Sequence, residues 1–236
     1  MSQRISAGWL PAIAGGAIGS VLTAGALLLA GPSLFGERLV RDALVANPDI
    51  IMEAGQALRD RQYAETLSPL RASLERPFFS SWKGAEKPDV TLTYFYDYAC
   101  GYCRQSNPDI ERLLKEDKGL RVVYRELPIL GPESVAAARV SLSASKAGKF
   151  AAYHDALYAA GRPSQETITL AAKAAGVPAV PTDDAAQEAE LKANMSFASQ
   201  LGATGTPLFI VGDRVINAAV GYDALKEAVK AARAKS

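Results

Sequence analysis

The longest apolar stretch of the chain lies in its first 35 residues. No charged residue follows Arg4 there, and Trp9 through Ala30 holds apolar and small residues with Ser and Thr as its polar members. Roughly 20 such residues are enough to cross a membrane core. A cleaved signal peptide is the alternative, with Ala24-Gly25-Ala26 as the cleavage site, but the apolar run continues past it. We expect residues 1–35 to be a membrane anchor in preference to a signal peptide, and in either case the rest of the chain to be exported.

Residues 36–87 carry a weaker apolar pattern at helical spacing. Its first stripe, from Leu39 to Val45, ends at Asn47-Pro48, where Asn47 suits a helix N-cap and Pro48 the first position of a second helix that runs to about Tyr63. This pattern predicts a helical stalk. Two interpretations stay open, because no heptad run is long enough to decide: the helices pack back on the next domain, or they join copies of the chain.

From residue 88 onward the pattern changes to that of a mixed α/β domain. Two apolar runs read as buried strands, and two shorter runs joined by Gly212-Asp213 read as a hairpin. The final segment has apolar residues on one helical face. These elements are Val90–Tyr96, Leu120–Leu127, the hairpin arms Pro207–Val211 and Arg214–Ala218, and the closing helix Tyr222–Arg233.

The region between the second strand and the hairpin is rich in alanine and helical in pattern. It extends from Glu133 to about Gln200 and is interrupted at Gly161–Ser164 and Gly176–Pro181. A further helix is expected from Asn107 to Lys118, after the first strand. The order is therefore strand, helix, strand, helical region, hairpin and closing helix.

The chemistry that this domain offers lies in its two cysteines, Cys100 and Cys103, which are the only ones in the chain. Two residues separate them, as in zinc sites, haem attachment sites and redox pairs. A zinc site lacks further sulfur or nitrogen ligands beyond His154, and haem attachment would need histidine where Arg104 stands. A structural disulfide over so small a loop would stabilise little. Redox chemistry is the favoured interpretation, with a disulfide that opens and closes between the two sulfurs.

The position of the pair explains how it would react. The cysteines follow the first strand, so Cys100 falls at a helix N-terminus, where unpaired N–H groups and the helix dipole stabilise a thiolate. Arg104 adds a nearby cation. Such surroundings lower a thiol pKa to about 3.5–7.5. We expect Cys100 to be the exposed nucleophile and Cys103, one turn into the helix, to resolve the mixed disulfide.

Three features together resemble a known family. They are the run Phe95 to Cys103, Pro108 within the following helix, and Thr206-Pro207 before the hairpin. The chain is similar here to the DsbA-like thiol-disulfide oxidoreductases of the thioredoxin-fold superfamily. The resemblance implies a thioredoxin fold over residues 88–236 with an all-helical insertion at about 132–201.

The resemblance also implies roles for single residues. Pro207 would be cis and face the disulfide, Thr206 would offer backbone groups to an extended substrate peptide, and Gly101 and Tyr102 would contact that peptide. The family acts on exported proteins that contain cysteine, in the periplasm, and relies on a redox partner in the inner membrane. It needs no cofactor and no metal.

The stalk carries a second resemblance. Ala46 to Glu53 is similar to the N-terminal helices of ScsC-like suppressors of copper sensitivity, whose stalks assemble the protein. This implies a homo-oligomer joined through residues 36–87, as well as a second possible role for the cysteines, as soft Cu(I) ligands of a copper-binding or thiol-chaperone module without general oxidase activity.

Several residues depart from the DsbA pattern and leave the direction of electron flow open. Oxidases of this type often have histidine where Tyr102 stands, and the Gly101-Tyr102 pair resembles that of DsbC-like isomerases. Tyr94 occupies the position of an acid that many thioredoxin-fold enzymes bury. Asp97 is closer to the cysteines, but we expect it to accept hydrogen bonds in the turn. An oxidase, an isomerase and a reductase all remain compatible with the sequence.

The net charge of +1 argues against a nucleic-acid partner. His154 lies in helical sequence without a partner motif, so we expect a surface or satisfied side chain, not a catalyst.

Overall fold

The structure is a computed structural model that describes residues 36–180 and 184–234, and it divides into two units, Met1–Ala57 and Leu58–Ser236. The predicted anchor lies outside the described residues. Within the described ranges, no helix combines the length and the apolar character that a membrane span requires.

The described part of the first unit is helical. One helix covers residues 36–46, and α2 (Asp49–Leu74) begins after a short break and continues into the second unit. Asn47 does not cap α2 with its side chain as expected, because its Nδ2 donates to the carbonyl oxygen of Ala43 in the preceding helix (3.4 Å). Apolar side chains in this unit are exposed: Leu39, Val40, Val45, Ile50, Ile51 and Met52.

The second unit is built on a five-stranded sheet with the order β1-β3-β2-β4-β5. Its strands are β1 (Trp82–Gly84), β2 (Val90–Tyr96), β3 (Leu120–Glu126), β4 (Leu208–Val211) and β5 (Arg214–Ile216). Strands β2 and β3 are parallel and the other pairs are antiparallel. The predicted strands are confirmed with small changes at their ends, whereas β1 has only three residues and therefore shows no alternating pattern that could reveal it.

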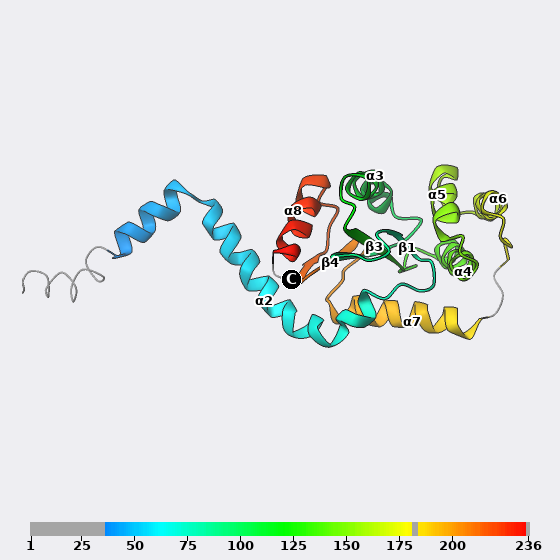
Figure 1. Ribbon diagram of the computed structural model, residues 1–236, viewed down its shortest axis with the longest axis horizontal. Coiled ribbons are helices and arrows are strands. Elements are labelled where there is room, and N and C mark those ends of the chain that lie inside the picture. Colours follow the sequence, from blue (N-terminus) through cyan, green and yellow to red (C-terminus); the bar gives the residue numbers. More distant parts are fainter. Residues whose placement is uncertain (1–35, 181–183, 235–236) are drawn as a thin grey trace, which may run out of the picture. The chain divides into compact units, whose positions relative to one another are not determined.

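Helices cover both faces of this sheet (Figure 1). Helices α3 (Gly101–Glu116) and α8 (Tyr222–Arg233) lie on one face, and α7 (Ala185–Gln200) lies on the other together with the last turns of α2. Three further helices, α4 (Pro132–Lys146), α5 (Phe150–Ala160) and α6 (Gln165–Ala175), complete the helical region between β3 and α7. The thioredoxin-like fold with its helical insertion is thus as the sequence predicts.

Helix α3 differs from its predicted bounds. It begins at Gly101, because the Cys100 side chain accepts the N–H of Cys103 as an N-cap, and it ends at Glu116, two residues early. This start agrees with the expected place of Cys100 at a helix N-terminus, although the polar residues of the first two turns show no apolar periodicity before Asn107.

The alternation along β2 divides the core in two. Tyr94 and Tyr96 face the larger cluster, with α3, α5 and α8, whereas Phe95 faces a smaller one with Leu208 and Ile210. Leu67 and Leu74 of α2 belong to this smaller cluster and are about 1% exposed. The last part of the predicted stalk, from Tyr63 on, therefore packs back on the sheet.

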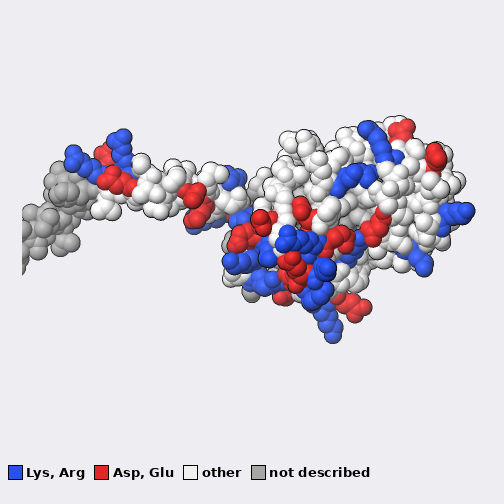
Figure 2. All heavy atoms as spheres, turned by 90° about the horizontal axis from the view of Figure 1, so that it is seen from above, with Lys and Arg blue, Asp and Glu red and all other residues white. Residues whose placement is uncertain are grey.

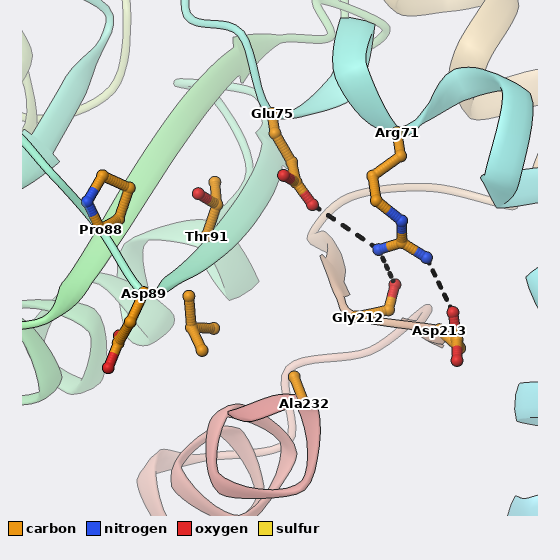
Figure 3. Close-up of a pocket in the computed structure, with 9 residues that line it drawn as sticks. Arg71, Glu75, Pro88, Asp89, Thr91, Gly212, Asp213 and Ala232 are labelled. Carbon is orange, nitrogen blue, oxygen red and sulfur yellow. Dashed lines mark hydrogen bonds and ion pairs between the residues drawn. The ribbon is translucent and has the colours of Figure 1, made fainter. Parts of the chain in front are cut away.

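Two arginines hold the end of α2. The guanidinium of Arg71 donates to the carbonyl oxygen of Gly212 (2.8 Å) and to Asp213 (2.7 Å) in the β4–β5 turn, and it lies 3.6 Å from Glu75 (Figure 3). Arg125 of β3 is buried and donates to the carbonyl oxygens of Ser73, Leu74 and Arg76. Both contacts give partners to carbonyl groups at a helix end or a turn, and the Thr93 hydroxyl also donates to the carbonyl oxygen of Leu74.

The hollow drawn in Figure 3, of about 440 Å³, lies between these elements and the start of β2. Since the cysteines follow the other end of β2, it is separate from their turn. The charged side chains of the face in Figure 2 are of both signs and intermingled, so this face offers no surface of one sign.

Candidate active site

The cysteine turn joins β2 to α3. Both cysteines are free thiols, and the N–H of Cys103 donates to the Sγ of Cys100 over 3.4 Å. Cys103 is fully buried, as expected, but Cys100 is only 6% exposed, so the prediction of an exposed nucleophile is wrong. The reason is the loop at Thr206, whose carbonyl oxygen lies 3.2 Å from the Cys100 Sγ and within reach of its thiol proton.

The Asp97 carboxylate holds the cysteine turn in place through hydrogen bonds. Its carboxylate accepts the N–H groups of Ala99 (2.8 Å), Ile129 (2.8 Å) and Leu130 (3.0 Å) and the hydroxyl of Ser134 (2.6 Å). Its carbonyl oxygen accepts the N–H of Cys100. The expectation that Asp97 is a turn acceptor is confirmed, and the same side chain ties the cysteine turn to the loop after β3.

The two thiols differ strongly in acidity. A hydrogen bond from the Cys103 thiol, with further ones from the Thr206 side chain and the backbone of Cys103 and Tyr102, outweighs burial and lowers the pKa of Cys100 from 9.0 to about 5. Burial raises the pKa of Cys103 far above its ordinary value, and its hydrogen bond to Cys100 adds to this. Cys100 is therefore ionised at neutral pH, and Cys103 keeps its proton.

Arg104 does not act as the expected cation. Its guanidinium donates to the carbonyl oxygens of Tyr158 and Gly161 (2.7 Å for the latter) and stacks over the Tyr158 ring. The local hydrogen bonds, and not a charged neighbour, make Cys100 acidic.

The Thr206–Pro207 peptide bond is cis, as the resemblance implied, and leads directly into β4. A groove of about 350 Å³ lies beside it, lined by Tyr102, Thr204, Gly205, Thr206, Pro207, Asn217, Ala218 and Ala219. The groove brings the predicted residues Tyr102, Thr206 and Pro207 together. Gly101 is not part of its lining, and a side chain there would meet nothing within 4 Å.

Asn217, Ala218 and Ala219 were not predicted as site residues. The sequence pattern extended the second hairpin arm to Ala218, whereas β5 ends at Ile216 and the chain then turns along the groove. The antiparallel pairing of β4 with β5 returns these residues to the start of β4, and only the hairpin register could have indicated this.

A cluster of buried aromatic rings lies beneath the turn. The Tyr94 hydroxyl donates to the carbonyl oxygen of Cys103 (3.3 Å). His154 is 2% exposed and lies among the rings of Tyr96, Tyr98, Tyr124, Phe150 and Tyr158, so of the two expected alternatives, a surface or a satisfied side chain, the surface position is wrong. Its Nδ1 is 3.0 Å from Asp155, while its Nε2 has no hydrogen-bond partner in the structure.

Two family models match the chain. The DSBA-like thioredoxin domain matches residues 91–230, and the copper resistance protein ScsC N-terminal domain matches residues 37–65.

Solved structures with the same fold include relatives of about 30% identity. A periplasmic thioredoxin-like protein from Salmonella enterica serovar Typhimurium is 32% identical, covers 70% of this chain and 96% of its own, and superposes with a TM-score of 0.65. A linker-deletion variant of Proteus mirabilis ScsC is 30% identical over 85% of this chain and 94% of its own, with a TM-score of 0.68.

A further similarity covers only part of a much longer protein. A Na⁺/H⁺ antiporter NhaA from Salinispora tropica is 33% identical over 79 residues, which are 33% of this chain. The chain spans 12% of the length of the curated relatives it matches.

Proposed function

Because this chain belongs to the DSBA-like thioredoxin domain family, we propose that it exchanges disulfides with exported proteins through Cys100 and Cys103. The observation that carries the proposal is the geometry of Cys100: an acidic thiol at the N-terminus of α3, 3.2 Å from the cis-Pro loop and beside a groove. A thiolate next to a groove that can take an extended chain is what attack on a peptide disulfide requires.

The exchange proceeds in two displacements. The Cys100 thiolate attacks one sulfur of a substrate disulfide, forms a mixed disulfide and releases the other substrate sulfur as a thiolate. Cys103 then loses its proton and attacks the Cys100 sulfur, which closes the Cys100–Cys103 disulfide and releases the second substrate thiolate. The substrate is reduced and the enzyme oxidised by two electrons, and the reverse sequence oxidises a substrate dithiol.

We place the working direction on the side of isomerisation. The acidity of Cys100 stabilises the reduced form, which makes the Cys100–Cys103 disulfide oxidising and disfavours net reduction of substrates, while it keeps the Cys100 thiolate ready to attack wrongly paired disulfides. Tyr102 at the rim of the groove supports the same direction, and assembly of several active sites through the stalk, which we also propose, would serve it. Such an enzyme depends on an external dithiol, supplied by a membrane redox partner, to return it to the reduced form.

The location we propose is the periplasm, with tethering to the inner membrane through about residues 9–30. The apolar composition of that segment supports tethering, and the periplasmic relative from Salmonella supports the compartment.

The copper alternative rests on the match of residues 37–65 to the ScsC N-terminal domain. In the described part of the chain no cluster of three or more His, Cys, Asp or Glu side chains could hold a metal ion, so Cu(I) would depend on the two sulfurs alone. Copper titration of the reduced protein with and without Cys103→Ser separates this role from exchange.

The experiment is turnover of a peptide disulfide with glutathione as the reductant. Wild type should turn over, Cys100→Ser should lose activity to the background level, and Cys103→Ser should accumulate the mixed disulfide and turn over only as fast as glutathione itself releases it. Equal turnover by wild type and Cys100→Ser would contradict the proposed function.

A further inference from the structure

One buried acid has no role in the exchange described above. Glu126 is the last residue of β3, is 3% exposed and lies opposite Tyr96 in the parallel register. Its carboxylate accepts the Tyr96 hydroxyl, and among the described residues no ion pair joins it to a lysine or an arginine. Arg125, its neighbour in sequence, points to the other face of the sheet and pairs with Glu190.

The hydrogen bonds of Glu126 lead toward the cysteine turn. The Tyr96 hydroxyl also lies 3.2 Å from that of Tyr98, which is 2.9 Å from the Ser141 hydroxyl. A tyrosine hydroxyl has one proton, so Tyr96 can give it to Glu126 or to Tyr98 but not to both. Tyr98 stands two residues before Cys100. The charge of Glu126 therefore decides how hydrogen bonds are arranged directly beneath the redox turn.

Tyr158 links this network to the sulfurs. Its ring is 5.1 Å from that of Tyr98, and its hydroxyl donates to the carbonyl oxygen of Asp97, which also accepts the N–H of Cys100. Burial raises the pKa of Tyr158, and electrostatic coupling to the ionisable groups of Cys103, Glu126 and Cys100 raises it further. The Tyr158 side chain is thus coupled electrostatically both to the Glu126 carboxyl and to the cysteine pair.

The groups that face Glu126 favour its protonated form. Its pKa is raised to about 8, chiefly by burial. Hydrogen bonds from Ser141 and Tyr96 lower this pKa, and the charges of Asp97 and Glu190 raise it. The remaining titratable neighbours are tyrosines, namely Tyr98, Tyr153 and Tyr158, all with raised pKa values. His154 packs on the Tyr96 ring, and burial lowers its pKa, so it supplies no positive charge.

The other buried acids are each held by an ion pair or by several hydrogen bonds. The described buried carboxylates are Asp60, Asp97 and Glu126. Asp60 pairs with Arg214, and Asp97 accepts four hydrogen bonds. Tyr94 fills the position next to Cys103 with a hydroxyl. Glu126 is therefore the buried acid that can change its protonation when the cysteines change their charge.

We propose that Glu126 is a positioning residue that takes up a proton when the Cys100–Cys103 disulfide is reduced; this rests on the proposed function. Reduction breaks the S–S bond with two electrons from an external dithiol, leaves a thiolate on Cys100 and places one proton on Cys103. The new negative charge opposes ionised Glu126, so the carboxylate binds a second proton from solvent. By linkage, protonation of Glu126 favours the reduced form by the same factor.

The test is the glutathione redox equilibrium of wild type and Glu126→Gln as a function of pH. Below about pH 7 both carry a neutral group at this position, and the ratio of their equilibrium constants should be constant. Between about pH 7 and pH 9 the wild-type constant for reduction should fall about three- to tenfold relative to that of the variant, as expected for one buried charge near another. Glu133→Gln, which removes an exposed acid at the start of α4, should follow wild type.

Parallel curves for wild type and Glu126→Gln would overturn the proposal while leaving the proposed function intact. Absence of any exchange in all three proteins would overturn both. Should Glu126→Gln fail to fold, the ¹³C-carboxyl titration of wild type replaces it: the Glu126 pKa must be higher in the reduced than in the oxidised protein, and equal values would overturn the proposal.

Discussion

At the scale of single residues, the acidity of Cys100 comes from donors that point at its sulfur. The first of these is the Cys103 thiol, so Cys103→Ala should raise the pKa of Cys100 above about 5. Arg104→Gln should leave that pKa nearly unchanged, because the guanidinium binds two carbonyl oxygens instead. The rate of iodoacetamide alkylation against pH measures both. A large rise of the Cys100 pKa in Arg104→Gln would show that the guanidinium does stabilise the thiolate, as the sequence suggested.

The same acidity makes the reduced protein sensitive to pH. The folded-state pKa of Cys100 is depressed, so its contribution to stability is fully present above about pH 9 and is lost as the pH falls toward about 5. At 1.36 kcal/mol per pK unit, this contribution has an upper limit of about 5 kcal/mol. Cys103 has a raised pKa when folded and stays neutral, and an unfolded thiol is neutral as well below about pH 8, so up to that pH Cys100 alone of the two sets the slope.

Asp97 is the residue on which the shape of the turn depends. Asp97→Ala leaves three backbone N–H groups and the Ser134 hydroxyl without their acceptor, so we expect a loss of about 2–4 kcal/mol in the free energy of unfolding. Urea unfolding measures it, with the exposed Glu133→Ala as control. A loss equal to that of the control would show that water replaces the carboxylate.

At the scale of elements, the packing of α2 depends on a buried arginine. Arg125→Met removes the donors to three carbonyl oxygens at the end of α2 and leaves Glu190 without its cation. We expect a loss of about 3–5 kcal/mol and earlier proteolysis near residues 73–77. Arg139→Met, which removes an exposed ion pair with Glu188, is the matched control. Unchanged proteolysis would mean that Leu67 and Leu74 hold the helix by themselves.

The elements also show what the sequence could and could not predict. The strands β2 and β3 were predicted from their apolar runs, and α8 was predicted from its apolar helical face. Burial on one or both faces of an element leaves such a pattern of apolar positions. The burial of Cys100 and of His154 was missed because covering groups are distant in sequence: the Thr206 loop for Cys100, and the rings of Tyr96, Tyr98 and Tyr124 for His154. The far side of the groove at Asn217 was missed for the same reason.

At the scale of the whole molecule, the exposed apolar side chains of residues 36–57 support assembly through the stalk. A triple variant with Leu39, Val40 and Ile51 changed to Ser should have a lower sedimentation coefficient and lose isomerisation of a scrambled substrate while keeping exchange with a small disulfide. Leu170→Ser removes an exposed apolar residue of α6 as a control. An unchanged sedimentation coefficient in the triple variant would contradict assembly through these residues.

The central claim is that Cys100 is the sulfur that meets the substrate. The most direct measurement is mass spectrometry of the covalent adduct formed when Cys103→Ala and Cys100→Ala are each mixed with a peptide disulfide near neutral pH. We predict one peptide on Cys100 in the first variant and a far slower reaction in the second, because Cys103 is buried and protonated. An adduct on Cys103 that forms as fast as that on Cys100, or no adduct in either variant, would contradict the account.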